Sequence, residues 1–275
     1  MHISKIKSLR QKIIHNSLTS IYFAGSGHPG GVLSSLDIIL NLFLTEIGTY
    51  KKKFNKNRFV LSKGHSAPAL YAVAKEFGYL TKIDLKNLRK INSKTQGHPS
   101  TNYTKWVECN TGSLGQGLSY SVGLAMGYKL KKYKKKIYCV IGDGEMQEGQ
   151  VWEALMFASH HKLNNLCVFL DYNKMQSDDL NRNIITIEPI DKKIKSFGWN
   201  LTKINGHNYR QIQNSIKKFK NSSKPFFVIA NTIKGNEISF MKNEPLWHGS
   251  VKIQKNEMLK IIAELGTANH GIKIL

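Results

Sequence analysis

Residues 137–173 read IYCVIGDGEMQEGQVWEALMFASHHKLNNLCVFLDYN. Two short apolar runs, Ile137–Ile141 and Leu166–Leu170, flank a stretch with helical spacing of its apolar residues from Val151 to His161. Short apolar runs of this kind are typical of strands that are buried on both faces. A strand, a helix and a second strand in this order predict a parallel β-α-β unit, so the stretch indicates an α/β fold.

Polar side chains follow both of these strands. Asp143 lies in the triplet Gly142-Asp143-Gly144, and Asn173 closes the triplet Asp171-Tyr172-Asn173. If the two strands are neighbours, these side chains meet at one edge of the sheet. Carboxylate and amide oxygens suit a hard divalent cation, and diphosphate oxygens would complete the octahedron that Mg²⁺ prefers.

The alternation of strand and helix patterns continues along the chain without a composition shift or a repeat. We expect one domain over residues 1–275, with a parallel sheet that carries helices on both faces. Further strands are predicted at Arg58–Leu61, Asn200–Ile204 and Pro225–Ala230, and further helices at Ile3–Thr19, Val32–Ile47, Ala67–Gly78, Gly115–Lys129 and Tyr209–Phe219.

The composition predicts a folded cytoplasmic protein. The chain has 275 residues, of which 41% are hydrophobic, enough for a sizeable core. We find neither an apolar run of the ~18 residues that a membrane helix needs nor a signal-like N-terminus. Three cysteines without a CxxC pair indicate a reducing compartment, and Cys139 and Cys167 are expected to be buried.

The net charge of +23 is the outlying property, and two explanations compete for it. A nucleic-acid binder gathers basic residues on one face, usually with arginine, but only five of the 41 basic residues here are arginine. The lysine runs at 51–53 and 131–136 are also far apart in the sequence. We therefore favour a solvated basic surface over nucleic-acid binding, and expect the positive field to attract anionic substrates.

Residues 25–30, GSGHPG, fit the dinucleotide-binding pattern GxGxxG, but the surroundings do not. That fingerprint needs a strand before it and a helix that opens inside it. Here a helical pattern precedes the glycines, and Pro29 stands where the helix should begin. Two interpretations remain, a flexible turn between helices and a loop that presents His28 to a site.

The spacing of the two strand-end triplets resembles the thiamine diphosphate signature, in which GDG, a spacer and an Asn follow one another. Here 26 residues separate Gly144 from Asp171. Other segments resemble the transketolase family in the family's order. They are SGHPGG (26–31), LSKGHSAPALY (61–71), QGHPS (96–100), TGSLGQGLS (111–119), GDGEMQEGQVWEA (142–154), FGWN (197–200), INGHN (204–208) and WHG (247–249).

The resemblance covers the first of the three domains of a transketolase and implies the thiamine diphosphate-binding fold. It implies the N-terminal subunit of a split enzyme, whose C-terminal subunit carries the pyrimidine-binding domain and the glutamate that protonates the pyrimidine, in an α2β2 hetero-oligomer. The implied reaction, in the pentose phosphate pathway, moves a two-carbon ketol unit from a ketose phosphate to an aldose phosphate.

The resemblance also assigns the cofactor site, with thiamine diphosphate and Mg²⁺ (or Ca²⁺) as cofactors. Asp143 and Asn173 would ligate the metal through side-chain oxygens, and Met175 through its backbone carbonyl. Gly144 would donate its N–H to the diphosphate, a match of backbone donor and anion. Gly112 and Leu114 would line the pocket.

Four loop histidines fall on histidines of the family's motifs, although any one of them alone has a structural explanation. His65 and His248 resemble those near the diphosphate and the reaction centre, and His28 and His98 those that hold the donor sugar's oxygens. Glu148 resembles the member of a carboxylate network that reaches the partner's glutamate, whereas the simpler interpretation is that Glu148 and Glu153 are two exposed acids. We interpret His160 as structural.

Departures from the family pattern put the loops rather than the ligands in doubt. Ser113 replaces a proline, Ser100 a common glutamate, and Ser177 and Asp179 stand in a stretch that is usually apolar and then glycine. Three alternative functions remain open from the sequence. They are a half-subunit of another thiamine-dependent enzyme such as deoxyxylulose-phosphate synthase, a non-catalytic regulatory subunit, and a basic nucleic-acid-binding protein.

Overall fold

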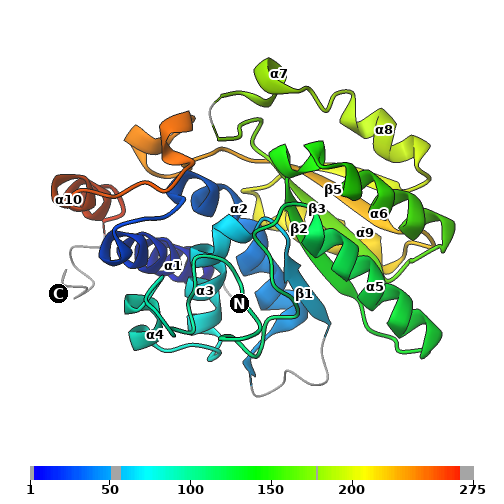
Figure 1. Cartoon of the computed structure of the whole chain (residues 1–275), viewed down its shortest axis with the longest axis horizontal. Helices are drawn as coiled ribbons and strands as arrows, with labels where there is room; N and C mark the ends of the chain where they lie inside the picture. Colours follow the sequence, from blue (N-terminus) through cyan, green and yellow to red (C-terminus); the bar gives the residue numbers. More distant parts are fainter. Residues whose placement is uncertain (1–2, 51–56, 178, 267–275) are drawn as a thin grey trace.

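The computed structural model describes residues 3–50, 57–177 and 179–266, and its centre is a five-stranded parallel sheet (Figure 1). The strands are β1 (Arg58–Leu61), β2 (Ile137–Gly142), β3 (Leu166–Tyr172), β4 (Asn200–Asn205) and β5 (Phe226–Asn231). Their order in the sheet is β1-β2-β3-β5-β4, and every neighbouring pair is parallel. All five predicted strands are confirmed, with ends that differ by no more than two residues.

The register of β2 and β3 confirms that these two strands are neighbours. Ile137 lies opposite Leu166, and Gly142 lies opposite Asp171. Asp143 and Asn173 therefore leave the sheet at the same edge, as expected.

The principal helices occur where the periodicity predicts them. They are α1 (Ile3–Ala24), α2 (Pro29–Leu42), α3 (Ala67–Glu76), α5 (Gln116–Leu130), α6 (Gly149–His160) and α9 (Tyr209–Lys220). The predicted start of the second helix at Val32 is wrong, because α2 begins at Pro29 and continues as a π-helical segment, Phe43–Ile47. A proline suits the first turn of a helix, where its missing N–H needs no partner.

Four further helices were not predicted. They are α4 (Lys82–Lys86), α7 (Asn181–Ile184), α8 (Ile190–Ser196) and α10 (Lys255–Glu264). Three of them are too short to show a full apolar stripe, so local signals begin them instead. In α4 the Thr81 hydroxyl accepts from the N–H of Asp84 while the Asp84 carboxylate accepts from the N–H of Thr81.

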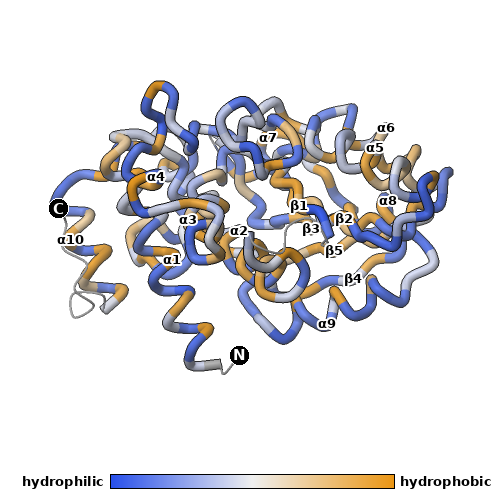
Figure 2. The backbone as a smooth tube through the Cα atoms, turned by 90° about the horizontal axis from the view of Figure 1, so that it is seen from below, coloured by the Kyte–Doolittle hydropathy of each residue, from blue (hydrophilic) through white to orange (hydrophobic). Residues whose placement is uncertain are grey.

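Helices cover both faces of the sheet, as predicted. One hydrophobic cluster joins α1, α2, α3 and α9 to alternate sheet residues such as Val140 and Phe169. A second joins α5, α6 and α8 to the intervening residues such as Cys139 and Val168. Figure 1 shows α5 and α6 in front of the strands, and in Figure 2 α9 alternates hydrophobic and hydrophilic residues, as a helix with one buried face does.

One helical stretch, Pro29–Ile47, is long and apolar enough to span a membrane by length and composition, but 89% of it is buried inside the fold. Cys139 and Cys167 are buried, as expected. Residues 131–134 of the second lysine run are exposed, whereas the first run, at 51–53, lies outside the described residues.

Candidate active site

A cavity of about 200 Å³ opens where the carboxyl ends of β2 and β3 meet. Eight of the predicted site residues line it, namely His65, Leu114, Asp143, Gly144, Glu148, Asn173, Met175 and His248. Residues 108 positions apart in the sequence, such as Lys63 and Asp171, also meet beside it. The remaining predicted residues, His28, His98 and Gly112, do not line this cavity. The ring of His28 lies beside those of His65 and His248, His98 lies beside His28, and Gly112 lies against His98.

Asp143 is a buried carboxyl group of this cavity, with a relative exposure of 2%. One carboxylate oxygen accepts from the N–H of Gly144 at 2.9 Å, and the other accepts from the N–H of Lys174. Burial raises the pKa of Asp143 to about 7, the negative charge of Asp171 adds to the rise, and Lys63 opposes it. A carboxylate in this environment is stabilised as an anion by an additional cation.

Asn173 is held in place from both sides of its amide. Its Oδ1 accepts from the N–H of Met175 at 3.0 Å, and its Nδ2 donates to the hydroxyl of Ser34 at 3.3 Å. Ser34 lies on α2 and in turn donates to Asp171 at 2.6 Å. The amide oxygen is therefore aimed by two elements that are more than 100 residues apart in the sequence.

The donor set of Asp143, Asn173 and the Met175 carbonyl fits a hard divalent cation. It consists of oxygens, it includes one buried carboxylate, and it leaves positions for ligands from a diphosphate. Among the described residues, no three His, Cys, Asp or Glu side chains form a metal-binding group of their own. The set thus has a single carboxylate, so a cation bound here would need further negative charge from a bound ligand such as a diphosphate.

The four predicted histidines form one cluster. The ring of His28 lies 5.3 Å from that of His65, 5.9 Å from that of His248 and 6.5 Å from that of His98, measured between centroids. Burial, together with nearby cations, lowers the pKa of His28 to about 4 and that of His248 to about 3. These imidazoles are therefore neutral near pH 7 and act as hydrogen-bonding groups rather than as cations.

Gly112 makes room for one of these rings. A Cβ at this position would come within 2.8 Å of the His98 ring, and the φ of Gly112 is +127°, where side chains are disfavoured. Gly112 thus contributes to the site by allowing the His98 ring to pack directly against its backbone.

Three charged residues beside the cavity were not predicted as site residues. Lys63, directly after β1, forms a buried ion pair with Asp171. Lys234, in the loop after β5, is fully buried, and its ammonium lies 2.8 Å from Nδ1 of His248. Lys63 lies in the LSKGHSAPALY segment, but the resemblance assigns a role only to the histidine of that segment. Lys234 lies in none of the segments that resemble the family.

The two glutamates that follow GDG differ in environment. Glu145 is buried and accepts from the N–H groups of Gly115 and Gly142 at 2.8 and 3.0 Å, so it ties the loop before α5 to the end of β2. Glu148 is exposed at the rim of the cavity, and Glu153 is exposed on α6. The predicted link between Glu148 and a partner's carboxylate stays a prediction.

The departures from the family pattern leave the cavity intact. Ser177 lines it, and Ser113 is exposed. The carboxylate of Asp179 accepts from Leu180 N at 2.6 Å and from Asn183 Nδ2 at 2.8 Å, and so contacts the first turn of α7. His160 is exposed at the end of α6, away from the cavity.

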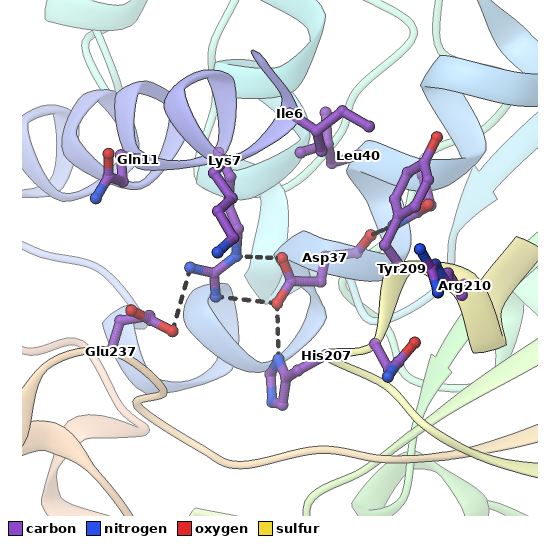
Figure 3. Close-up of a pocket in the computed structure, with 12 residues that line it drawn as sticks. Ile6, Lys7, Gln11, Asp37, Leu40, His207, Tyr209, Arg210 and Glu237 are labelled. Atoms are coloured by element: carbon purple, nitrogen blue, oxygen red, sulfur yellow. Dashed lines mark hydrogen bonds and ion pairs between the residues drawn. The ribbon is translucent and has the colours of Figure 1, made fainter. Parts of the chain in front are cut away.

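A larger cavity, of about 680 Å³, lies on the other side of α2 and contains none of the predicted site residues (Figure 3). At its floor the buried Asp37 accepts from Arg10 at 2.5 Å and contacts Nδ1 of His207 at 2.7 Å. Arg10 also pairs with Glu237 at 3.2 Å. Arg10 thus pairs with both carboxylates, and His207 of the INGHN segment ties the loop after β4 to α2 through Asp37.

The fold and the cavity together define an α/β domain that can hold an anionic, metal-associated ligand at its strand ends. Residues 6–273 match the family described as transketolase, thiamine diphosphate binding domain. The chain therefore belongs to the transketolase family, and it corresponds to the N-terminal, thiamine diphosphate-binding domain. In the short dinucleotide pattern at 25–30, residues 25–28 form the loop between α1 and α2, and α2 opens at Pro29 inside the pattern. The element before the pattern is a helix, not the strand that the dinucleotide fingerprint needs.

Two relatives of similar length are named as subunits of transketolases. The apulose-4-phosphate transketolase subunit of Actinobacillus succinogenes is 35% identical over 94% of both chains. The 6-deoxy-6-sulfo-D-fructose transketolase subunit of Clostridium sp. is 37% identical over 90% of this chain and 92% of its own. These relatives match the chain almost from end to end.

Whole transketolases are matched over less than half of their length. Human transketolase is 37% identical over 96% of this chain, which spans 42% of that protein. The crystal structure of transketolase from Campylobacter jejuni superimposes with a TM-score of 0.91 at 29% identity, over all of this chain and 44% of that one. The family match confirms the thiamine diphosphate-binding fold.

Proposed function

We propose that this chain is the N-terminal subunit of a split transketolase and transfers a two-carbon ketol unit from a ketose phosphate to an aldose phosphate. The observation that carries the proposal is the joint presence of Asp143, Asn173 and the four-histidine cluster around one cavity. The two relatives that are named as transketolase subunits support it. A half-subunit of deoxyxylulose-phosphate synthase is not favoured, because the subunit-length relatives are transketolases.

The cofactor is held by groups from four strand ends in this proposal. Asp143, Asn173 and the Met175 carbonyl hold Mg²⁺ or Ca²⁺, and the Gly144 N–H faces the diphosphate. Lys63 and Lys234 add positive charge beside the same cavity. When bound, thiamine diphosphate supplies the carbanion and the electron sink that the cleavage of a carbon–carbon bond requires.

The histidines orient the sugar rather than the metal. His28 and His98 donate hydrogen bonds to oxygens of the donor sugar, and His65 and His248 lie nearer the diphosphate. Because burial lowers the pKa of all four, each acts as a neutral hydrogen-bond donor or acceptor without holding a permanent charge.

The partner, in this proposal, is a C-terminal subunit with the pyrimidine-binding domain. It supplies the glutamate that protonates the pyrimidine, and the exposed Glu148 connects to that glutamate through a carboxylate network at the interface. We propose an α2β2 assembly that acts in the cytoplasm, within the pentose phosphate pathway.

The test is reconstitution. The chain is purified alone and co-expressed with an adjacent reading frame that encodes a pyrimidine-binding domain, and ketol transfer is assayed with and without thiamine diphosphate and Mg²⁺. We expect activity only for the co-expressed pair with both cofactors. Ketol transfer by the single chain, or its absence from the cofactor-loaded pair, would contradict the proposal.

A further inference from the structure

Arg89 links the two loops that carry His28 and His98. Its Nη1 donates to the hydroxyl of Ser26 at 2.6 Å, and its Nη2 lies 3.5 Å from Nδ1 of His28. A Cβ on Gly97, directly before His98, would lie 3.2 Å from the Arg89 Nε. One guanidinium thus contacts the loop of residues 25–30 and packs against the loop of residues 96–100.

The backbone of Arg89 is built for this placement. Its φ is +63°, in the left-handed region that non-glycine residues rarely adopt, and its N–H donates to the carbonyl of Thr95 at 2.8 Å. A residue held in this region is fixed by its surroundings rather than by its own preference. The Nε of Arg89 is buried and has no hydrogen-bond partner among the described residues, so the polar contacts of the guanidinium are those of its two terminal nitrogens with Ser26 and His28.

The contact with His28 has a definite polarity. A guanidinium carries only donors, so Nδ1 of His28 must be the acceptor. In a neutral imidazole the other nitrogen, Nε2, then carries the proton. The cationic guanidinium, together with burial, also lowers the pKa of His28, which keeps the ring neutral.

We propose that Arg89 is the positioning residue that sets the tautomer of His28, so that Nε2–H is the single donor that this ring offers to the donor sugar. The proposal rests on the proposed function, in which His28 faces the sugar. It explains why an arginine with a strained backbone lies between two histidine loops. It also means that His28 acts as a hydrogen-bond donor and not as a general acid, because its ring is neutral and not an imidazolium.

The direct test is the ring nitrogen spectrum of His28. The full chain is labelled with ¹⁵N-histidine, long-range ¹H–¹⁵N couplings are recorded at pH 7, and His28→Asn identifies the signal. We expect His28 of the unmutated chain to be protonated at Nε2 alone, and Arg89→Met to show a second population protonated at Nδ1. Lys90→Met is the matched control, since it removes an exposed neighbouring cation outside the histidine cluster.

Two results would overturn the proposal. One is a proton on Nδ1 of His28 in the unmutated chain, and the other is an Arg89→Met spectrum identical to that of Lys90→Met. If Arg89→Met does not fold, as judged by circular dichroism, Ser26→Ala decides. It leaves Arg89 in the chain but removes the 2.6 Å contact that holds the guanidinium, and an unchanged His28 tautomer would then count against the proposal.

A kinetic arm separates this proposal from the proposed function. In the co-expressed pair, Arg89→Met should lower kcat/KM for the donor sugar by up to about 10²-fold, as a misplaced catalytic group does, without changing cofactor affinity. Lys90→Met should leave both unchanged. If the unmutated pair transfers no ketol group, the proposed function fails, while the nitrogen spectra still decide the role of Arg89.

Discussion

The ammonium of Lys234 lies 2.8 Å from Nδ1 of His248, and Lys234 is fully buried. The same ammonium donates to the carbonyl of Gln176 at 3.1 Å. Burial lowers the pKa of Lys234 to about 8, and the charge of Lys63 contributes to the shift. A buried ammonium that is not fully balanced by neighbouring anions destabilises the cofactor-free chain. Its presence here is explained if the cavity binds a polyanion such as a diphosphate.

Lys234→Met should therefore stabilise the cofactor-free chain at pH 7. The folded pKa of about 8 lies below the ordinary value of 10.5, so the unfolded chain binds one more proton between these pH values and stability rises with pH there. Below pH 8 the full penalty, roughly 3 kcal/mol, is present, and methionine removes it. Urea unfolding at pH 7 and pH 10 measures the effect, with the exposed Lys217→Met as control. A variant less stable than the unmutated chain at pH 7 would show that the ammonium is not penalised.

Asp143→Ala should abolish the Mg²⁺-dependent binding of thiamine diphosphate in the assembled enzyme. The substitution removes an oxygen ligand and, with it, the single carboxylate of the predicted ligand set. Calorimetric titration of the cofactor with and without Mg²⁺ measures the loss. Glu153→Ala, which removes an exposed carboxylate of α6, is the matched control and should bind normally. An unchanged dissociation constant for Asp143→Ala would exclude Asp143 as a ligand.

His98→Ala should weaken turnover and spare the cofactor. His98 packs against Gly112 in the histidine cluster and does not line the cavity of Asp143 and Asn173. Loss of its hydrogen bond to the sugar should lower kcat/KM by ~10²-fold. Steady-state kinetics at saturating cofactor and a separate cofactor titration test this, with His160→Ala as control. Loss of cofactor binding with normal sugar kinetics would reverse the assignment of the histidines.

The positive charge should give only weak, sequence-independent DNA binding. The exposed lysines of residues 131–134 attract phosphate groups without the bidentate contacts that arginine makes with them. The affinity for DNA should therefore fall steeply as the salt concentration rises. A gel-shift series with duplexes of different sequence, from low salt to ~150 mM, measures this. Tight and sequence-selective binding at the highest salt would support the nucleic-acid alternative instead.

The sheet was predictable because each strand is a short apolar run whose neighbours in sequence are helices. Ile137–Gly142 and Leu166–Tyr172 are buried along almost their entire length, so their composition alone separates them from the loops. The short helices α4, α7 and α8 were not predictable from periodicity, since they begin with local contacts such as the cap at Thr81 or follow Pro189.

The site was predictable only in part. Asp143 and Asn173 could be named in advance because they directly follow predicted strands, where ligands approach such a sheet. The histidines could be named because they fall on histidines of the family's motifs. Lys63 and Lys234 could not be assigned, because a lysine in a sequence with a net charge of +23 carries no information about its burial. The same holds for Arg89, whose role depends on contacts with Ser26 and His28, which lie 63 and 61 positions earlier in the sequence.

Local composition and spacing along the chain were enough to predict the succession of strands and helices and the residue types that stand at the strand ends, and the resemblance of its motifs indicated the family. Which of these residues meet depended on the packing of the whole domain. Parallel pairing of β2 and β3 brings Asp143 and Asn173 to one edge, and the loop after β5 folds back to place Lys234 against His248. Burial then sets the charge state of each group, because the cost of a charge depends on the solvent and the neighbours that the fold leaves around it.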